Sequence, residues 1–249
     1  MLSIIIPVLN EAETIESLLL HLSENSSGAN DLEVILVDGG SIDNTAEIVE
    51  NFIETFSRPV RFQKSDRSFT IQVIPSNKGR AIQMNTGASL ASGEILYFLH
   101  ADSFPPKNFD SYIISEVNKG NLAGCFQIKF DSNHWWLRLA GWLTKFKWKG
   151  CRGGDQSQFI TKTLFREIDG FDENYIIYED NILINTLYKK KQFVVIPHWV
   201  ITSARRYETQ GIWNLQYHFW IIHLKQFFGA DAEELHRYYK KHIEGKKHK

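Results

Sequence analysis

The chain of 249 residues has only two cysteines, Cys125 and Cys151. Two cysteines cannot build a disulfide framework or a four-cysteine metal site, and they fit a reducing compartment. The sequence also lacks any uninterrupted apolar run of about 18 residues or more, the length that a membrane-spanning helix needs. No basic segment precedes the short apolar run at the N-terminus, which argues against a secretory signal peptide. We therefore expect a cytoplasmic protein.

The charges of the chain nearly cancel, since 28 lysines and arginines face 29 acidic residues and give a formal net charge of −1. Such a chain has no global basic field to attract a nucleic acid. A glycine-rich turn is missing after the first apolar segment, which disfavours a dinucleotide fold and a sugar nucleotidyltransferase. Aromatic side chains, in contrast, are abundant, at 13% of the residues with seven tryptophans.

Apolar strands and amphipathic helices alternate along the first half of the chain. Strands are expected at 3–8, 33–37 and 94–99, and helices at 43–56 and 79–91. Asn10 and Glu13 have the spacing of a capping box, so Asn10 is the expected N-cap of a further helix, between the strands at 3–8 and 33–37. Because strands alternate with helices, we expect an α/β protein with a mostly parallel sheet covered by helices on both faces.

The second half is less regular, but it also contains strands and helices. Strands are expected at 123–130, 158–161, 192–196 and 199–202, and helices at 135–146, 179–188, 212–228 and 232–242.

Polar side chains follow three of the predicted strands at the point where each strand ends. These are Asn10 and Glu11 after the first strand, Asp38 after the second, and His100 and Asp102 after the third. In open α/β sheets, ligands bind at the carboxyl ends of the strands. We therefore expect these side chains to share a pocket.

The same segments resemble the family 2 glycosyltransferases of the GT-A fold. The matching motifs, in order, are SIIIPVLNEAETI, EVILVDGGSIDNTAEI, NKGRAIQMNTGASLASGEILYFLHAD, GFDENYIIYEDNILI and TSARRYE. The combination of GRAxQMN, LHAD, GGDQ and TSARR is similar to a bacterial subgroup whose genes often lie beside radical-SAM genes. The resemblance implies a GT-A domain over 1–210, with a nucleotide-binding half (1–105) and an acceptor and catalytic half (106–210). The remaining 211–249 would form a C-terminal helical extension.

The resemblance also implies a reaction. It predicts a metal-dependent, inverting, hexosyltransferase-type enzyme that moves a sugar from a nucleotide sugar, preferably a UDP-sugar, to a hydroxyl acceptor. The expected cofactor is Mg²⁺ or Mn²⁺. The alternative is a catalytically inactive module that binds a nucleotide or a sugar and has kept only the fold. His100 keeps this alternative open, because the family has an Asp-x-Asp-like element where this chain has His100 and Asp102.

By resemblance, Asp102 is the metal ligand, and His100 is either a second ligand or a cap of its strand. Asp38 would accept a hydrogen bond from the nucleotide base, although an Asp before two glycines is also a common turn former. Glu11 would contact the base or ribose, or only favour the first turn of a helix electrostatically. The full predicted donor-binding set is Pro7, Asn10, Glu11, Asp38, Gly39, Gly79, Arg80, Gln83, Ala101, Asp102, Arg205 and Arg206.

The acidic pair Glu179-Asp180 resembles the family's Glu-Asp motif, which implies that Asp180 is the general base. The predicted catalytic set is Asp180, Glu179 and Asp155, the last of these from the GGDQ motif. Arg80 and the pair Arg205-Arg206 would grip the diphosphate, and each could equally be a solvated surface arginine. An acidic residue at the start of a helix is also favoured by the helix dipole alone.

Two aromatic segments, 134–152 and 212–228, stand apart from these motifs. In the second, the residues Trp213, Tyr217, Trp220, Leu224, Phe227 and Phe228 share one helix face. The favoured interpretation is a helix packed on the sheet or on a second subunit, which would make a homo-oligomer. The alternative is a helix lying on the inner face of a membrane, where it would meet a lipid-linked acceptor such as a polyprenyl phosphate.

Overall fold

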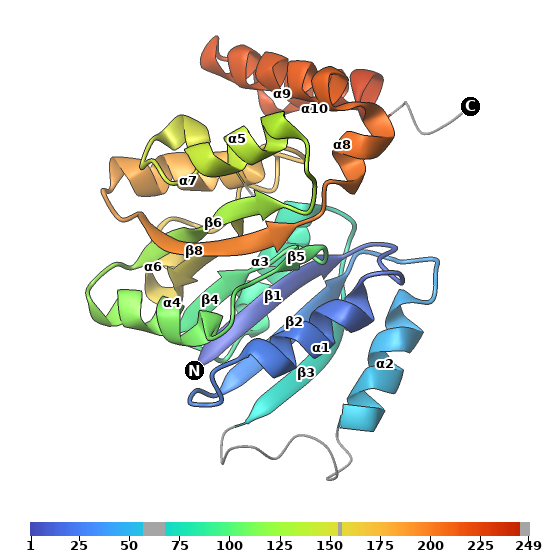
Figure 1. Ribbon diagram of the computed structural model, residues 1–249, viewed down its shortest axis with the longest axis vertical. Coiled ribbons are helices and arrows are strands. Elements are labelled where there is room, and N and C mark those ends of the chain that lie inside the picture. The colour runs from blue at the N-terminus through green and yellow to red at the C-terminus, as the bar shows by residue number, and fades with distance from the viewer. Residues whose placement is uncertain (57–67, 154–155, 245–249) are drawn as a thin grey trace.

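The computed structural model describes residues 1–56, 68–153 and 156–244, which form one mixed sheet with helices on both sides (Figure 1). The strands are β1 (Leu2–Val8), β2 (Leu32–Asp38), β3 (Phe69–Pro75), β4 (Ile95–Phe98), β5 (Ser103–Phe104), β6 (Ala123–Phe130), β7 (Gln158–Thr161) and β8 (Val194–Thr202). Their order across the sheet is β3-β2-β1-β4-β7-β6-β8-β5.

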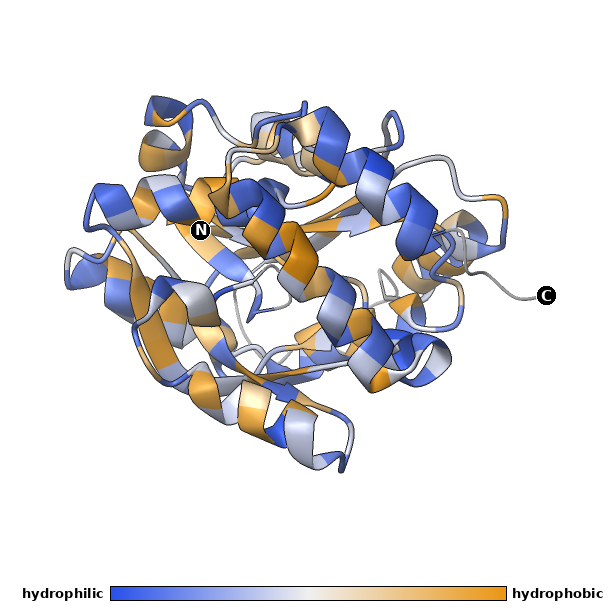
Figure 2. Cartoon of the chain, turned by 90° about the horizontal axis from the view of Figure 1, so that it is seen from above, coloured by the Kyte–Doolittle hydropathy of each residue, from blue (hydrophilic) through white to orange (hydrophobic). Residues whose placement is uncertain are grey.

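The helices surround this sheet. They are α1 (Ile15–Asn25), α2 (Thr45–Phe56), α3 (Arg80–Leu90), α4 (Phe109–Asn118), α5 (Trp135–Leu143), α6 (Lys162–Glu167), α7 (Glu179–Lys189), α8 (Arg205–Gln210), α9 (Ile212–Phe227) and α10 (Ala232–His242), with a 3₁₀ turn η1 (Lys149–Cys151). Seen from above in Figure 2, the helices carry both hydrophobic and hydrophilic residues, as expected of helices that bury one face.

The central strands are largely apolar because both of their faces are buried, and the polar exceptions Ser3 and Glu33 hydrogen-bond to each other. β1 pairs in parallel with β2 and with β4, and Ile4, Ile5 and Ile6 are all fully buried. Since alternate side chains of a strand point to opposite faces, Ile4 and Ile6 join one core cluster and Ile5 joins the other. Continuous apolar runs of this kind are typical of parallel strands covered on both sides.

Each face of the sheet has its own set of helices. The first core cluster contains residues of α1, α2, α4 and α5, and the second contains residues of α3, α6 and α7. The prediction of a mostly parallel α/β sheet covered on both faces is therefore confirmed. Each antiparallel pair includes a strand from the second half of the chain: β7 runs against both β4 and β6, and β5 runs against β8.

One prediction about the strands is wrong. The segments 192–196 and 199–202 were expected to be separate strands, but Val194–Thr202 forms the single strand β8. Its register on β6 shifts, so that Phe126 faces Ile196 and the next residue, Gln127, faces Trp199. Pro197 and His198 are thus accommodated in a bulge, where the missing N–H of proline does not interrupt the ladder.

The C-terminal helices share a small third core built on Leu215, Ile222, Leu235 and Ile243. In α9 the buried residues are Leu215, His218 and Ile222, which lie opposite the side of the helix that carries the six predicted aromatic and apolar residues. The interpretation that this side packs on the sheet is wrong, because its six residues are 49–82% exposed, and packing on a second subunit stays a prediction. None of the described helices is long and apolar enough to cross a membrane.

Candidate active site

The loops after β1 and β2 are tied together by side chains of the predicted site. Asn10 has a positive φ of 57° and accepts a hydrogen bond at Oδ1 from the Ile42 backbone N–H. The expectation that Asn10 caps the first helix is wrong, because α1 begins at Ile15 with Thr14 at the N-cap position. Asp38 accepts hydrogen bonds from the N–H and the hydroxyl of Ser41, which hold its carboxylate at the end of β2.

Gln83 connects the ends of β1 and β2 from the side of α3. Its amide Nε2 donates to the backbone oxygen of Val8 at 2.9 Å and to that of Val37 at 2.7 Å. The space for this amide exists because the neighbouring residue is Gly39, where an added Cβ would lie 3.0 Å from the Gln83 side chain. Gln83 is only 4% exposed, so its polar atoms fix the two strand ends from within the protein.

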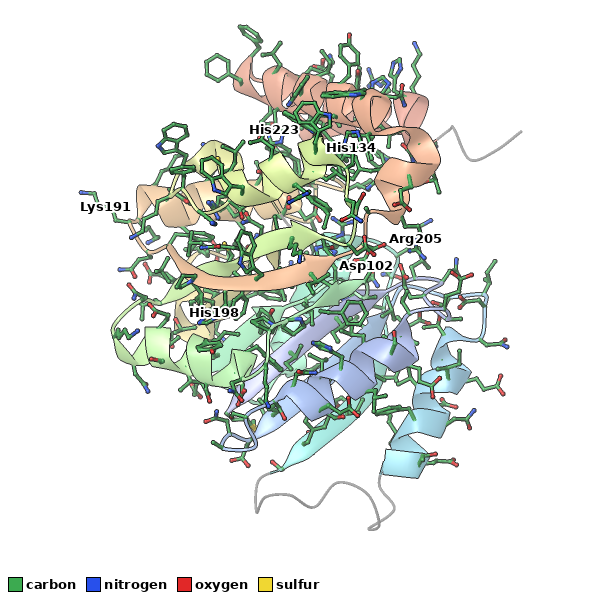
Figure 3. All side chains as sticks on the ribbon, in the orientation of Figure 1. Asp102, His134, Lys191, His198, Arg205 and His223 are labelled. Carbon is green, nitrogen blue, oxygen red and sulfur yellow. The ribbon has the colours of Figure 1, made fainter. Side chains whose placement is uncertain are left out.

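The segment between β4 and β5 carries His100, Ala101 and Asp102. All three line a cleft of about 1480 Å³ that opens at the carboxyl end of the parallel strands. Figure 3 shows Asp102 at the same end of the sheet as Arg205, with His223 above them on α9. The backbone oxygen of Asp102 accepts from Ser203 N–H, which ties this turn to the end of β8.

Glu179 and Asp180, at the first turn of α7, have different surroundings. Asp180 lines the cleft, whereas Glu179 is completely buried and forms an ion pair with Arg80 at 3.2 Å. The second carboxylate oxygen of Glu179, Oε2, has no hydrogen-bond partner among the described residues. Burial raises the pKa of Glu179 to about 7, although the Arg80 guanidinium opposes this rise.

Helix α9 contributes to the cleft beside the start of α7, where both His223 and Tyr178 line it. The His223 ring nitrogen Nδ1 lies 2.9 Å from the hydroxyl of Tyr178, the residue that precedes the acidic pair. Burial raises the pKa of Tyr178 to about 12, and burial lowers the pKa of His223. Neither residue was predicted from the sequence. Two features of the sequence could have identified them: Tyr178 is an aromatic residue directly before the acidic pair, and His223 is a histidine within an apolar helix.

The two predicted arginines after β8 take different partners. Arg205 forms an ion pair with Glu11 at 3.4 Å, so the end of the chain's last strand contacts the loop after the first. Arg206 lines the cleft and donates to the hydroxyl of Tyr239 on α10. Its guanidinium also lies 5.2 Å from the centre of the Tyr239 ring, a cation–π contact.

The cleft unites much of the predicted site. Its lining includes Pro7, Glu11, Gly79, Arg80, Gln83, His100, Ala101, Asp102, Asp180 and Arg206. Asn10, Asp38, Gly39, Glu179 and Arg205 are outside this lining, and Asp155 lies outside the described residues. The sequence did not identify Lys78, Ser203, Trp220, Phe227, His236 and Lys240, which also line the cleft.

No group of three or more histidine, cysteine or acidic side chains within the described ranges could hold a metal ion by itself. At the strand end the chain provides one carboxylate, Asp102, with His100 two residues earlier. A divalent cation could bind there only if a ligand or water supplied the other oxygens. Mg²⁺ is commonly bound in this way, through one or two carboxylates together with substrate phosphates.

The chain is similar in sequence to known glycosyltransferases. Residues 3–176 match the family described as Glycosyl transferase family 2. An "Uncharacterized glycosyltransferase" of Haemophilus influenzae is 31% identical over 215 residues, which cover 82% of this chain and 79% of that protein. The glycosyltransferase AglE of Haloferax volcanii is 34% identical over 116 residues, or 47% of this chain and 35% of AglE.

Among solved structures, S. aureus TarS 1–349 in complex with UDP superposes with a TM-score of 0.63 at 16% identity. The match covers 82% of this chain and 60% of that one. A second structure, of the same protein in complex with UDP-GlcNAc, gives a TM-score of 0.61. The chain therefore spans about a third of AglE and three fifths of TarS 1–349. At this identity the similarity to TarS establishes the GT-A fold alone.

Proposed function

Because the chain belongs to glycosyltransferase family 2, we propose that it transfers a sugar from a UDP-sugar to a hydroxyl acceptor with inversion of configuration. The observation that carries this proposal is that one cleft joins Asp102, from the end of β4, to Asp180, from the start of α7. Two carboxylates from distant parts of the chain thus line the same cleft. Asp102 is suited to hold a cation at the departing diphosphate, and Asp180 is suited to accept the proton of the acceptor hydroxyl.

The donor half of the cleft is built by the ends of the parallel strands. Pro7 and Gly79 line the cleft, and Asp38, just outside this lining, is held at the end of β2 by Ser41. The donor base is proposed to be uracil, whose N–H would donate a hydrogen bond to the Asp38 carboxylate. The bound UDP and UDP-GlcNAc of the TarS structures support this choice of nucleotide.

Asp102 is proposed to hold Mg²⁺ or Mn²⁺, with His100 beside it, and the diphosphate and water would complete the coordination. Such an ion, when bound, supplies positive charge that stabilises the diphosphate as it leaves. Arg80 and Arg206 line the same cleft and would add donors for phosphate oxygens. Glu179 holds the Arg80 guanidinium from its buried side and so orients it.

Asp180 is proposed to be the general base. Its carboxylate would accept the proton of the acceptor hydroxyl as that oxygen attacks the anomeric carbon and the bond to the diphosphate breaks. A single displacement of this kind inverts the configuration. Asp180 is held by the helix that begins at Glu179, and its Oδ1 accepts from the N–H of Asn181 at 2.8 Å. Asp155 remains a proposed catalytic residue from the family motif only.

The experiment is a release assay for UDP with a panel of UDP-sugars and Mn²⁺. We expect Asp180→Asn to lower turnover by about 10²- to 10⁴-fold, the usual contribution of a general base. Asp102→Ala should lower it at least as much. Glu50→Gln, which removes one charge from the exposed face of α2, is the control and should retain full turnover. Wild-type turnover in both site variants would refute the assigned roles.

A further inference from the structure

Helix α9 exposes a continuous apolar face although its other side is packed. Trp213, Trp220 and Phe227 are 50%, 49% and 82% exposed. They recur at intervals of seven residues, which places them on one side of a helix. Exposed apolar side chains gathered in this way are uncommon on a protein that has no partner there.

Helix α5 and the turn after it continue this surface. Trp135, Trp142 and Trp148 are 59%, 46% and 71% exposed. Trp135 and Trp213 lie with their ring centres 5.7 Å apart, so the two helices meet through their tryptophans. Figure 1 shows α5 and α9 on the same end of the molecule, beyond β6 and β8. We call Trp135, Trp142, Trp148, Trp213, Trp220, Phe227 and Phe228 the aromatic face.

The exposed charges of the segment that carries Trp135, Trp142 and Trp148 have one sign. Residues 132–153 contain five basic side chains and no acidic one, and of the five only Arg152 is buried. On α9 the one lysine, Lys225, pairs with Glu234 of α10. The rest of the chain must therefore be acidic, since the formal net charge is −1. Lys145, Lys147 and Lys149 alternate with the aromatic residues and are exposed. The aromatic face is thus complementary to a surface with negatively charged groups on the outside and an apolar interior beneath them.

We propose that the aromatic face docks on the surface of an anionic lipid bilayer. Tryptophan and phenylalanine would enter the boundary between head groups and acyl chains, and the lysines would contact the anionic head groups. A second copy of the chain fits less well, because a symmetric contact would bring two sets of lysines together. The docked protein would lie on the membrane without spanning it.

Docking would also orient the cleft. Trp220, Leu224 and Phe227 belong to the exposed side of α9 and line the cleft as well. The cleft therefore opens beside the aromatic face, and an acceptor anchored in the bilayer would reach Asp180 from that side. This consequence rests on the proposed function, whereas binding to lipid does not.

The test is co-sedimentation of the full chain with vesicles. One preparation contains phosphatidylcholine alone, and the other contains equal parts of phosphatidylcholine and phosphatidylglycerol. We expect binding to the mixed vesicles, weaker binding to the neutral ones, and release by salt. Trp148→Ser/Phe228→Ser should weaken binding at least about tenfold, since each buried aromatic ring contributes apolar area. Both residues lie outside the cleft lining.

Matched variants control for the loss of apolar surface and of charge. Leu20→Ser/Leu90→Ser changes two exposed leucines on α1 and α3 and should bind as the wild type does. Lys147→Glu should lose the preference for anionic vesicles, and Lys107→Glu, on the exposed segment before α4, should keep it. Thermal unfolding of every variant checks that it folds.

Several results would overturn the proposal. Failure of the wild type to bind either vesicle would do so, as would equal binding to both or equal losses in the leucine control. A dimer in solution that Trp148→Ser/Phe228→Ser breaks, without vesicle binding, would assign the face to a second copy. Release of UDP from a soluble donor is measured separately. Its absence with intact vesicle binding would refute the enzymatic proposal and leave the docking proposal standing.

Discussion

The Glu179 carboxylate lies 3.2 Å from the Arg80 guanidinium and joins the first turns of α7 and α3. The carboxylate side chain is completely buried, whereas the arginine side chain is 42% exposed. Only one partner of this ion pair has therefore lost its contact with water. This asymmetry explains why burial dominates the pKa of Glu179 and raises it from 4.5 to about 7.

The first prediction concerns stability against pH. Because the folded protein binds the Glu179 proton more tightly than the unfolded chain, this residue's contribution is greatest below pH 4.5 and declines as pH rises to about 7. Glu179→Gln removes this titration. Relative to the wild type, the variant should therefore gain up to about 3 kcal/mol in free energy of unfolding between pH 4.5 and pH 8. Urea unfolding at both values measures this.

The control for this comparison is Glu167→Gln. Glu167 is 58% exposed and pairs with Lys190 at the surface, so the change should leave the pH dependence of the wild type intact. An identical pH dependence in Glu179→Gln and the wild type would show that Glu179 titrates in the folded protein as it does in the unfolded chain.

The second prediction separates binding from turnover. UDP with Mn²⁺ should raise the melting temperature of the wild type and of Asp180→Asn, because the base is not needed to bind the product. At a ligand concentration about 100 times Kd, the stabilisation is about 2.7 kcal/mol. Asp102→Ala should lose the part of the shift that depends on manganese, and a chelator should remove that part from the wild type. A full manganese-dependent shift in Asp102→Ala would place the ion elsewhere.

The third prediction concerns the amide that ties the strand ends. Gln83→Ala leaves the backbone oxygens of Val8 and Val37 without the hydrogen bonds that Nε2 donates. Loss of a buried partner costs about 1–3 kcal/mol per group left unsatisfied, although the Val8 oxygen keeps the hydrogen bond from the Gly39 N–H. We expect a free energy of unfolding lower by about 1–3 kcal/mol in denaturant titrations. Gln72→Ala, on the exposed side of β3, should change it little, and equal effects would contradict a bridging role.

The fourth prediction tests the close approach of β6 and β8. A Cβ at Gly124 would lie 2.3 Å from the Val194 backbone oxygen and 2.8 Å from the Phe159 ring. Gly124→Ala should lower the free energy of unfolding by about 1–3 kcal/mol or more, since the backbone must move. Gly150→Ala, where an added Cβ meets nothing within 4 Å, is the control. Wild-type stability of Gly124→Ala would mean that the two strands can separate without penalty.

Local patterns predicted the first half of the fold because its strands and helices form from nearby residues. The run at β1 is apolar on both faces, and α3 follows its predicted range closely. The boundary of α1 was missed because Asn10 makes its hydrogen bond to Ile42, more than thirty residues away. The bulge that keeps β8 continuous depends likewise on its partner strand β6.

For the site, the order of motifs along the chain was enough to predict the family. The family motifs in turn singled out two carboxylates, Asp102 after β4 and Asp180 at the start of α7. The sequence also specified the apolar periodicity of α9, which any amphipathic helix would show. Only the tertiary structure decided which side of α9 is buried, and that Glu179 is enclosed while Asp180 faces the cleft. The physical reason is that exposure belongs to a side chain's neighbours in space, and most of those neighbours lie far away along the chain.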